Sequence, residues 1–258
     1  MAANRPEARL DGKVIVVTGA GMGMGKTHAQ LLAERGAHVV VQDIQKEKAE
    51  ETAQLVTKAG GKAHVVACDI SDTAAVAREF AAMEKALGRV DVLVNNAGIH
   101  NRRTIEQVTV DDFEKMFDVH VKGTFFATKA VIPGMKSRKS GKIINISSAW
   151  GMVGNPVDSH YCGAKAALLG VTKSWAKEYA PWNITVNAIA PGMVMTEMTK
   201  QNRSAAELKE FTDKLIPLGR LGEPVEFSYS VAFLASKESD FITGQVLSPN
   251  GGEFIVGF

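Results

Sequence analysis

Strand-length apolar runs alternate with longer helical stretches along most of this 258-residue chain. The apolar runs occupy residues 13–17, 38–42, 63–67, 90–94, 142–146 and 184–189. Helical stretches near residues 23–35, 46–59, 72–87, 109–137 and 159–180 are long enough to be crossover connections. Runs that are apolar throughout need burial on both faces. The repeated β-α-β units therefore predict a doubly wound α/β fold, with a parallel sheet between two layers of helices.

The domain organisation follows from the absence of a linker. No stretch rich in Pro, Gly or Ser divides the chain, so we expect one domain over residues 10–258. Residues 1–9, rich in Ala, Arg and Pro, are expected to be a mobile arm. The stretch from about 193 to 215 is neither a clean strand nor one long helix, and we expect it to be a substrate lid.

The composition excludes several kinds of partner. Lys and Arg total 30 against 28 for Asp and Glu, so a strongly basic nucleic-acid binder is not expected. No apolar run approaches the roughly 18 residues that span a bilayer, and the first residues lack a secretion signal. Cys68 and Cys162 lie far apart, with no metal-binding spacing. We expect a cytoplasmic protein without nucleic-acid, membrane or metal partners.

A glycine-rich turn follows the first apolar run. Residues 18–25 read TGAGMGMG and lead directly into a helical stretch. Glycine lets a backbone turn sharply and approach a pyrophosphate, and the next helix offers unpaired N–H groups to the phosphates. Asp43 ends the second run, 24 residues after Gly19, where a carboxylate can accept hydrogen bonds from a ribose. This order predicts dinucleotide binding through Gly19, Met22, Gly23, Met24, Gly25, Asp43 and Ile44.

The third and fourth runs also end in candidate cofactor residues. Asp69 and Ile70 follow the third run, where a carboxylate would suit an adenine amino group. The alternative is that Asp69 or Ser71 caps the next helix. After the fourth run come Asn96, Ala97 and Gly98, which can contact the cofactor, brace neighbouring strands, or do both.

The candidate catalytic residues follow the fifth run. Tyr161 and Lys165 are four residues apart in a helical stretch, so they share one face. A phenol has a pKa of about 10, and a nearby ammonium should lower it toward the range of a general base. Ser148 lies at the carboxyl end of the fifth run, where open α/β sheets bind ligands, and its hydroxyl can hydrogen-bond a substrate oxygen.

These motifs together resemble the short-chain dehydrogenase/reductase family in its compact subtype. TGAGMGMG, NNAG, ISS, YCGAK and PGMVMT occur in the order and spacing of that family, and the similarity runs from about Gly12 to Gly252. The resemblance implies a seven-stranded sheet and hydride transfer to or from a nicotinamide. It implies Tyr161 as the acid/base, Lys165 as tyrosine activator and ribose ligand, and Ser148 as the group that orients the substrate oxygen. A homotetramer is the assembly that the resemblance implies.

One position departs from the family pattern. Where the family has a fourth catalytic residue, an asparagine that opens an NxxG sequence, this chain has His120. We favour a relay role, in which His120 holds the water that passes protons from Lys165 to solvent. The alternative is a histidine bonded to a backbone carbonyl, with the relay following another route.

The resemblance also assigns the nicotinamide and substrate residues. It implies that the nicotinamide lies against Pro191, Gly192, Val194 and Thr196. An apolar substrate pocket beside it would be formed by residues between Ser148 and Tyr161 and in or just after the PGMVMT stretch, namely Trp150, Met152, Val153, Val157, Met193 and Met198, and the alternative for each is core packing.

The expected activity is NAD-dependent oxidation of a secondary alcohol, or reduction of the ketone, with an apolar or cyclic substrate. A 3-oxoacyl-carrier-protein reductase is the enzyme alternative, and it would need basic residues near the pocket mouth, for which Arg102, Arg103, Lys136 and Arg138 are candidates. A non-catalytic dinucleotide-binding sensor or scaffold is the alternative of another class. Intact Ser148, Tyr161 and Lys165 argue against that last reading.

Overall fold

Seven parallel strands form one sheet in the computed structural model, which describes residues 8–197, 199 and 203–255. The strands are β1 (Val14–Thr18), β2 (His38–Asp43), β3 (Lys62–Ala67), β4 (Val92–Asn95), β5 (Gly141–Ile146), β6 (Ile184–Ile189) and β7 (Val246–Leu247). Their order across the sheet is β3-β2-β1-β4-β5-β6-β7, and every neighbouring pair is parallel. This confirms the doubly wound fold and the seven strands that the resemblance implied.

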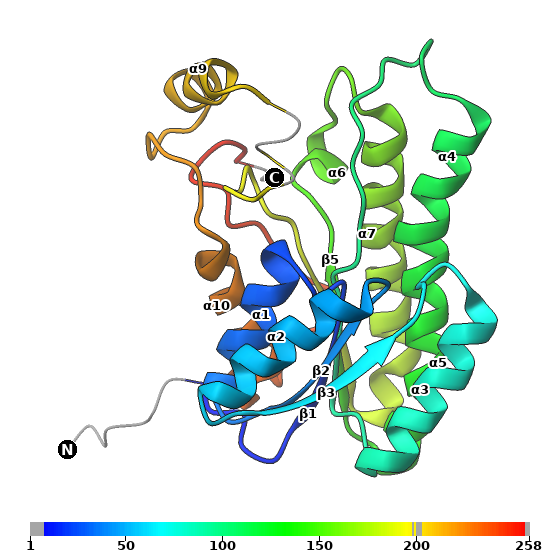
Figure 1. Cartoon of the computed structure of the whole chain (residues 1–258). Helices are drawn as coiled ribbons and strands as arrows, with labels where there is room; N and C mark the ends of the chain where they lie inside the picture. Colours follow the sequence, from blue (N-terminus) through cyan, green and yellow to red (C-terminus); the bar gives the residue numbers. More distant parts are fainter. Residues whose placement is uncertain (1–7, 198, 200–202, 256–258) are drawn as a thin grey trace.

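Helices cover both faces of the sheet (Figure 1). They are α1 (Gly23–Glu34), α2 (Lys46–Lys58), α3 (Thr73–Leu87), α4 (Val110–Phe117), α5 (Gly123–Arg138), α6 (Trp150–Val153), α7 (Ser159–Tyr179), α9 (Ala205–Leu215) and α10 (Pro224–Ala235). Single turns complete them: η1 (Asp118–Lys122), η2 (Ala180–Trp182) and η3 (Lys237–Ser239). Buried residues of α1, α2 and α10 share one core cluster, and those of α3, α5 and α7 share the other. No helix in the described ranges is long and apolar enough to cross a membrane.

The apolar strands divide their side chains between the two cores. Ile15 and Val17 of β1 belong to the cluster under α1 and α10, whereas Val14 and Val16 belong to the cluster under α3 and α5. Successive side chains of a strand point to opposite faces, so a strand covered on both faces must be apolar at every position. All five residues of β1 are buried, as the unbroken apolar run predicts.

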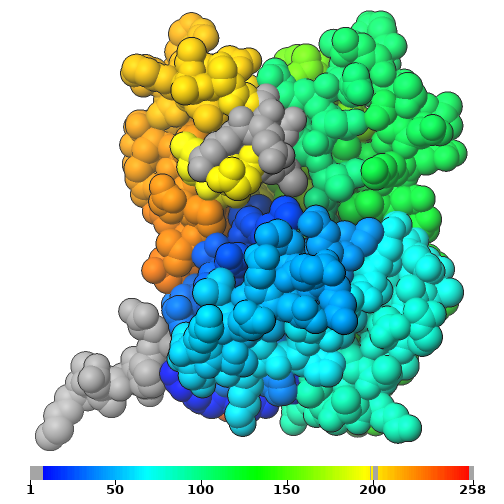
Figure 2. Space-filling model, in the orientation of Figure 1, coloured from blue at the N-terminus to red at the C-terminus, as the bar shows by residue number. Residues whose placement is uncertain are grey.

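The chain changes direction across the sheet after β3. The first three strands run outward from β1 to one edge, and β4 then pairs with the other side of β1. The loops after β1 and β4 therefore diverge at a topological switch point, which is where doubly wound sheets bind ligands. In the space-filling view the blue and cyan N-terminal residues form the lower part, with the yellow and orange C-terminal segments above them on one side and the green residues on the other (Figure 2).

Two regions show detail that the apolar pattern does not predict. The helical stretch expected near 109–137 contains a π-helical turn at Asp118–Lys122, between α4 and α5. In the expected lid, Ala205–Leu215 is a regular helix whose capping box pairs Ser204 with Glu207. Met198 and residues 200–202 lie outside the described residues, as does the expected N-terminal arm except Ala8 and Arg9. Ala8 is buried.

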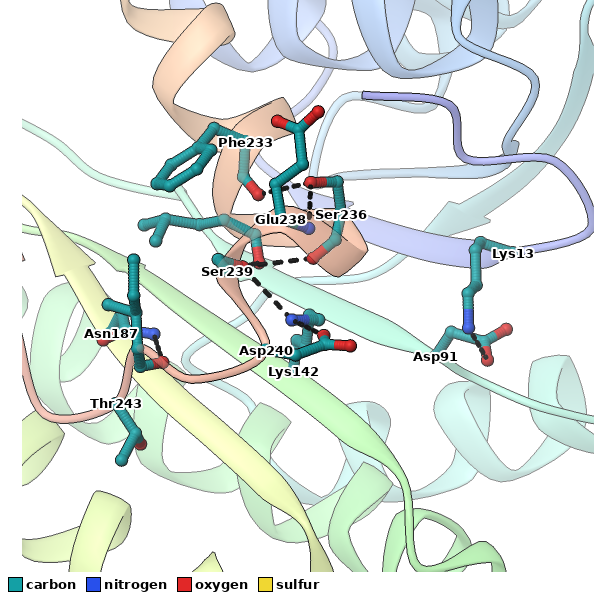
Figure 3. Close-up of polar contacts among 12 residues, drawn as sticks. Lys13, Asp91, Lys142, Asn187, Phe233, Ser236, Glu238, Ser239, Asp240 and Thr243 are labelled. Atoms are coloured by element: carbon teal, nitrogen blue, oxygen red, sulfur yellow. Dashed lines mark hydrogen bonds and ion pairs between the residues drawn. The ribbon is translucent and has the colours of Figure 1, made fainter. Parts of the chain in front are cut away.

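Polar contacts tie the C-terminal segment to the amino-terminal edge of the sheet (Figure 3). Lys142, near the start of β5, donates to Ser239 Oγ at 3.1 Å and pairs with Asp240 at 2.7 Å. The buried Ser239 hydroxyl donates to the carbonyl of Leu234 at 2.8 Å. These contacts brace the end of the sheet opposite Ser148, because Lys142 lies near the start of β5 and Ser148 follows the end of that strand.

Candidate active site

The glycine-rich turn after β1 is shaped by close backbone contacts. Gly19 and Gly23 have φ angles of +63° and +54°, which L side chains rarely adopt. A Cβ at Gly19 would stand 2.8 Å from Ala97 Cα, and one at Gly25 would stand 2.1 Å from the carbonyl oxygen of Gly19. No heavy atom lies within 4 Å of the Cβ position at Gly23. A turn that packs tightly on one side and is open at Gly23, directly at the start of α1, fits a dinucleotide pyrophosphate.

Asp43 presents a buried carboxylate beside this turn. Its two oxygens accept the backbone N–H groups of Gly21 and Gln45, each at 2.9 Å. The nearest lysines in the sequence pair with acids on their own helix: Lys46 with Glu50 and Lys48 with Glu51. Ile44 is exposed. No described cation therefore forms an ion pair with Asp43.

Asn95 and Asn96 brace the carboxyl end of β4. Asn95 Nδ2 donates to Asn145 Oδ1 at 2.9 Å and to Thr128 Oγ1 at 3.1 Å. Asn96 Nδ2 donates to the carbonyl of Thr18 at 2.9 Å, and so fixes the start of the glycine-rich turn. This is the bracing role considered for NNAG, and it positions Ala97 and Gly98 beside the turn.

The alternative for Asp69 and Ser71, a cap on the helix after β3, is wrong. Asp72 caps α3 by accepting from the N–H groups of Ala74 and Ala75, each at 3.0 Å. The carboxylate of Asp69 closes a local turn by accepting from Ser71 N and Ser71 Oγ, so neither residue caps the helix. Both aspartates lie within one short connection, and only Asp72 directly precedes the first helical residue. Ile70 is buried against Gly123.

Tyr161, Ser148 and Lys165 lie together at the carboxyl end of the sheet. Ser148 and Tyr161 line the same cleft, and Lys165 Nζ lies 5.7 Å from the centre of the Tyr161 ring. Burial raises the pKa of Tyr161 to about 12, and the neighbouring Ser148 hydroxyl acts in the opposite direction. We expected Lys165 to lower the pKa of Tyr161, and this effect is not found for the chain by itself. Removal from water outweighs the other effects of the chain on the phenol.

Lys165 is itself strongly perturbed. It is buried, and its ammonium donates to the carbonyl of Ile146 at 2.8 Å. Burial lowers the pKa of Lys165 to about 7. A lysine that loses part of its charge near neutrality is a weaker activator of a neighbouring phenol.

His120 lies on the π-helical turn, a distortion that is frequent at functional sites. Its Nε2 lies 2.8 Å from the carbonyl oxygen and 3.1 Å from the N–H nitrogen of Ile99. Its buried Nδ1 has no described hydrogen-bond partner. Burial, and next the charge of Lys165, hold the pKa of His120 well below its usual value. The contact with a backbone carbonyl matches the alternative considered for this residue, and the proton relay stays a prediction.

A cleft with an empty volume of about 700 Å³ opens above these residues. It is lined by Met24, His100, Ser147, Ser148, Ala149, Trp150, Tyr161, Pro191, Gly192, Met193, Val194, Thr196, Thr199 and Arg203. Of the expected substrate residues, Trp150 and Met193 line it. Met152, Val153 and Val157 are not among its lining residues, and Val153 is exposed. The expected nicotinamide residues Pro191, Gly192, Val194 and Thr196 all line the cleft.

Two polar residues of the cleft, His100 and Arg203, were not expected from the sequence. The ring of His100 meets that of Tyr161 edge-on, with the centroids 4.8 Å apart. The Arg203 guanidinium lies 5.7 Å from the Trp150 ring and 5.3 Å from the Phe211 ring. One sequence signal could have identified His100 as a residue of the cleft. It lies two residues after NNAG, a motif that already marked the end of a strand.

Comparisons with known proteins agree with this geometry over nearly the whole chain. A family described as enoyl-(acyl carrier protein) reductase matches residues 19–253. The 3-oxoacyl-(acyl-carrier-protein) reductase FabG of Thermotoga maritima is 39% identical over 244 residues, covering 95% of this chain and 98% of that protein. The cyclopentanol dehydrogenase of a Comamonas species is 37% identical over 248 residues, with coverage of 95% and 98%.

A solved structure gives the same result in three dimensions. A gluconate 5-dehydrogenase from Burkholderia cenocepacia, in complex with NADP and tartrate, superposes with a TM-score of 0.92 at 35% identity. The match covers 96% of this chain and 97% of that one. The fold and its relatives define a nucleotide-dependent oxidoreductase that acts on CH–OH groups. The chain belongs to the short-chain dehydrogenase/reductase family.

Proposed function

We propose that this protein is an NAD-dependent dehydrogenase of secondary alcohols that also reduces the corresponding ketones. The observation that carries the proposal is that Ser148 and Tyr161 line one cleft at the carboxyl end of the sheet, with the buried Lys165 5.7 Å from the centre of the Tyr161 ring. Such a cleft can hold an alcohol against a hydride acceptor while a side chain takes its proton.

The chemistry assigns one task to each side chain. A bound nicotinamide nucleotide supplies the hydride acceptor and a positive charge beside Tyr161. Ser148 hydrogen-bonds the substrate oxygen and holds it against the phenol. Tyr161 accepts the hydroxyl proton as the carbinol becomes a carbonyl, and returns it in the reverse reaction. Lys165 holds the ribose and delivers positive charge toward the phenol, and His120 would connect Lys165 to solvent.

The choice of NAD over NADP is supported by Asp43. Its carboxylate would meet the adenosine ribose, where NADP carries a 2′-phosphate. Two like charges about 4 Å apart at an effective dielectric near 20 repel by about 4 kcal/mol, and salt reduces this. Lys46 and Lys48 already pair with glutamates, so they do not offset that repulsion. We place Met22, Ile44, Asp69 and Ile70 around the same adenosine.

A compact alcohol, apolar or cyclic, is the substrate class that the cleft supports. Trp150, Met193 and Val194 give it apolar walls, and the resemblance to a cyclopentanol dehydrogenase points the same way. The basic residues considered for an acidic carrier protein are engaged elsewhere. Arg102 and Arg103 lie near Glu207 and Asp112, Lys136 lies 4.0 Å from the centre of the Trp182 ring, and Arg138 donates to the carbonyl of Val90.

A panel of alcohols tests this function directly. Cyclopentanol, cyclohexanol and short acyclic secondary alcohols are incubated with NAD or NADP, and reduced cofactor is followed by absorbance. Oxidation of the cyclic alcohols with NAD is expected. Reduction of a 3-oxoacyl-carrier-protein with NADPH, together with no alcohol oxidation, would instead establish the reductase alternative.

We also propose a cytoplasmic homotetramer. Phe113 on α4 and Phe125 on α5 are 47% and 44% exposed, an apolar surface that a symmetric partner would cover. Light scattering at micromolar concentration is expected to give the mass of four chains. A monomeric mass would refute the assembly.

The lid over about 193–215 is part of the same proposal. Its helix α9 has no buried residue, so few apolar contacts hold it to the body of the protein. Addition of NADH with a ketone is expected to slow amide exchange in this helix. Equal exchange with and without these ligands would show that the segment does not close.

A further inference from the structure

Asp158 is a fully buried carboxylate at a helix-capping position, but its side chain contacts His100 instead of the helix. It directly precedes α7, where an aspartate normally caps the helix. Its side chain makes no capping hydrogen bond. Instead, Oδ1 lies 2.9 Å from His100 Nε2, and Oδ2 accepts from the side-chain amide of Asn155. Both oxygens are thus committed away from the helix that they could have stabilised.

A buried carboxylate is costly unless its partners compensate it. Asp158 has 0% of its side chain exposed, and His100 has 10%. The carboxylate of Asp158 is therefore buried at a cost in folding free energy, and one of its contacts fixes the imidazole of His100. An ionised carboxylate only accepts hydrogen bonds, so Nε2 of His100 carries a proton, and in the neutral ring the lone pair is then on Nδ1.

The other side of His100 faces the cleft. His100 lines the cleft, and its Nδ1 makes no hydrogen bond with any described residue. Its ring centre lies 4.8 Å from that of Tyr161 and 6.0 Å from that of Trp150. A side chain in edge contact with the tyrosine can reach a substrate group one or two bonds from the reacting carbon.

We propose that His100, held in one tautomer by Asp158, accepts a hydrogen bond from a second hydroxyl group of the substrate. The preferred substrates are then vicinal diols, with α-hydroxy ketones in the reverse direction. His100 is a specificity-determining residue and Asp158 is its positioning residue. This inference rests on the proposed oxidation of alcohols and adds the polar group that the sequence-based apolar pocket lacked.

Three alcohols of matched ring size separate the effects: cyclohexanol, trans-cyclohexane-1,2-diol and trans-2-methoxycyclohexanol. The methyl ether keeps the bulk of the second oxygen but cannot donate a hydrogen bond to Nδ1. A site built around a substrate hydroxyl rejects analogues without it strongly. For the unmodified enzyme we expect kcat/KM for the diol to exceed that for the ether by about tenfold or more, mainly through KM.

The variants test each residue separately. His100→Phe is expected to bring the diol-to-ether ratio close to one. In Asp158→Asn the amide can donate to Nε2, which moves the proton to Nδ1 and makes that atom a donor. The value of kcat/KM for the ether should then rise relative to that for the diol. Mere loosening of a loop would not produce this reversal. His38→Phe, the same substitution at the amino-terminal end of β2, is the control and should keep the unmodified ratio.

Binding gives a readout that does not depend on turnover. Thermal shifts with NAD, which cannot reduce a ketone, are compared for 2-hydroxycyclohexanone and 2-methoxycyclohexanone, and the hydroxy ketone should stabilise the unmodified enzyme more. If cyclohexanol is oxidised but His100→Phe leaves the diol-to-ether ratio of kcat/KM unchanged, the proposed role of His100 is overturned. The proposed oxidation of alcohols would then stand. If none of the three alcohols is oxidised with either nucleotide, both the proposed function and this inference fail.

Discussion

The imidazole of His120 packs directly on Gly98: a Cβ at Gly98 would stand 2.5 Å from His120 Cε1. Gly98 follows β4 and His120 lies on the π-helical turn, so this contact joins the two segments beside Tyr161. The ring is buried, and its Nε2 is held at Ile99. Space for the histidine therefore depends on a glycine 22 residues earlier in the chain.

Gly98→Ala should displace His120 and destabilise the protein. Overpacking of a tight contact costs about 1–3 kcal/mol, so the midpoint of urea unfolding should fall. Gly170→Ala is the matched control, because Gly170 lies within α7 with no heavy atom within 4 Å of its Cβ position. That substitution should raise stability by up to about 1 kcal/mol. Equal midpoints for the two variants would contradict the close packing.

Tyr161→Phe should remove turnover and leave nucleotide binding largely intact. The phenol is the proposed proton acceptor, and such groups contribute about 10²- to 10⁴-fold to the rate. Turnover is measured with a secondary alcohol, and binding is measured by the fluorescence of NADH. Lys165→Ala should differ by weakening NADH binding as well. Activity of Tyr161→Phe near that of the unmodified enzyme would refute the assignment.

The stability of the nucleotide-free protein should rise with pH above about 7 because of Lys165. Burial lowers the pKa of this lysine to about 7, whereas an unfolded lysine has a pKa of about 10.4. Between these values the unfolded chain binds more protons than the folded one, so the free energy of unfolding increases with pH. Below pH 7 both states are protonated, and the burial penalty is fully present.

Lys165→Met removes this dependence and tests it. The variant should gain the most stability over the unmodified protein near pH 6, on the order of a few kcal/mol, and the gain should shrink toward pH 10. Urea unfolding at a series of pH values measures the difference. A gain that stays constant across this range would show that Lys165 is protonated throughout.

Asp43→Asn should shift the nucleotide preference from NAD toward NADP. The amide keeps an oxygen that can accept from Gly21 or Gln45 but removes the charge that repels a 2′-phosphate. We expect the unmodified enzyme to prefer NAD by two to three orders of magnitude, and the variant by much less. The ratio of kcat/KM for the two nucleotides is the measurement. An unmodified enzyme with equal or higher kcat/KM for NADP would contradict the placement of Asp43.

The sheet was predictable because burial on both faces leaves a continuous apolar run. The run at 184–189 corresponds to the whole of β6. Strand β7 has only two residues, both half-buried, and gives no comparable signal. Its presence was expected only from the family resemblance, since nothing in Val246 and Leu247 alone separates a short edge strand from a loop.

The site was predictable where its residues are close in sequence or fixed to strand ends. Tyr161 and Lys165 share a helix face, and Ser148 follows a strand, so simple geometry brings them together. His100 and Asp158 are separated by 58 positions and meet only through the packing of a loop against the start of α7. An aspartate directly before a helix normally caps it, and only the folded structure shows that Asp158 contacts His100 instead.

The two-residue length of β7 has a consequence for behaviour at high concentration. The outer edge of a sheet offers unpaired N–H and C=O groups that can recruit strands from other molecules. This edge offers only Val246 and Leu247, too short a template for stable pairing between molecules. At the opposite edge, β3 begins with the exposed charge of Lys62, which discourages the same contact. The β7 edge is therefore expected to resist edge-to-edge pairing between molecules.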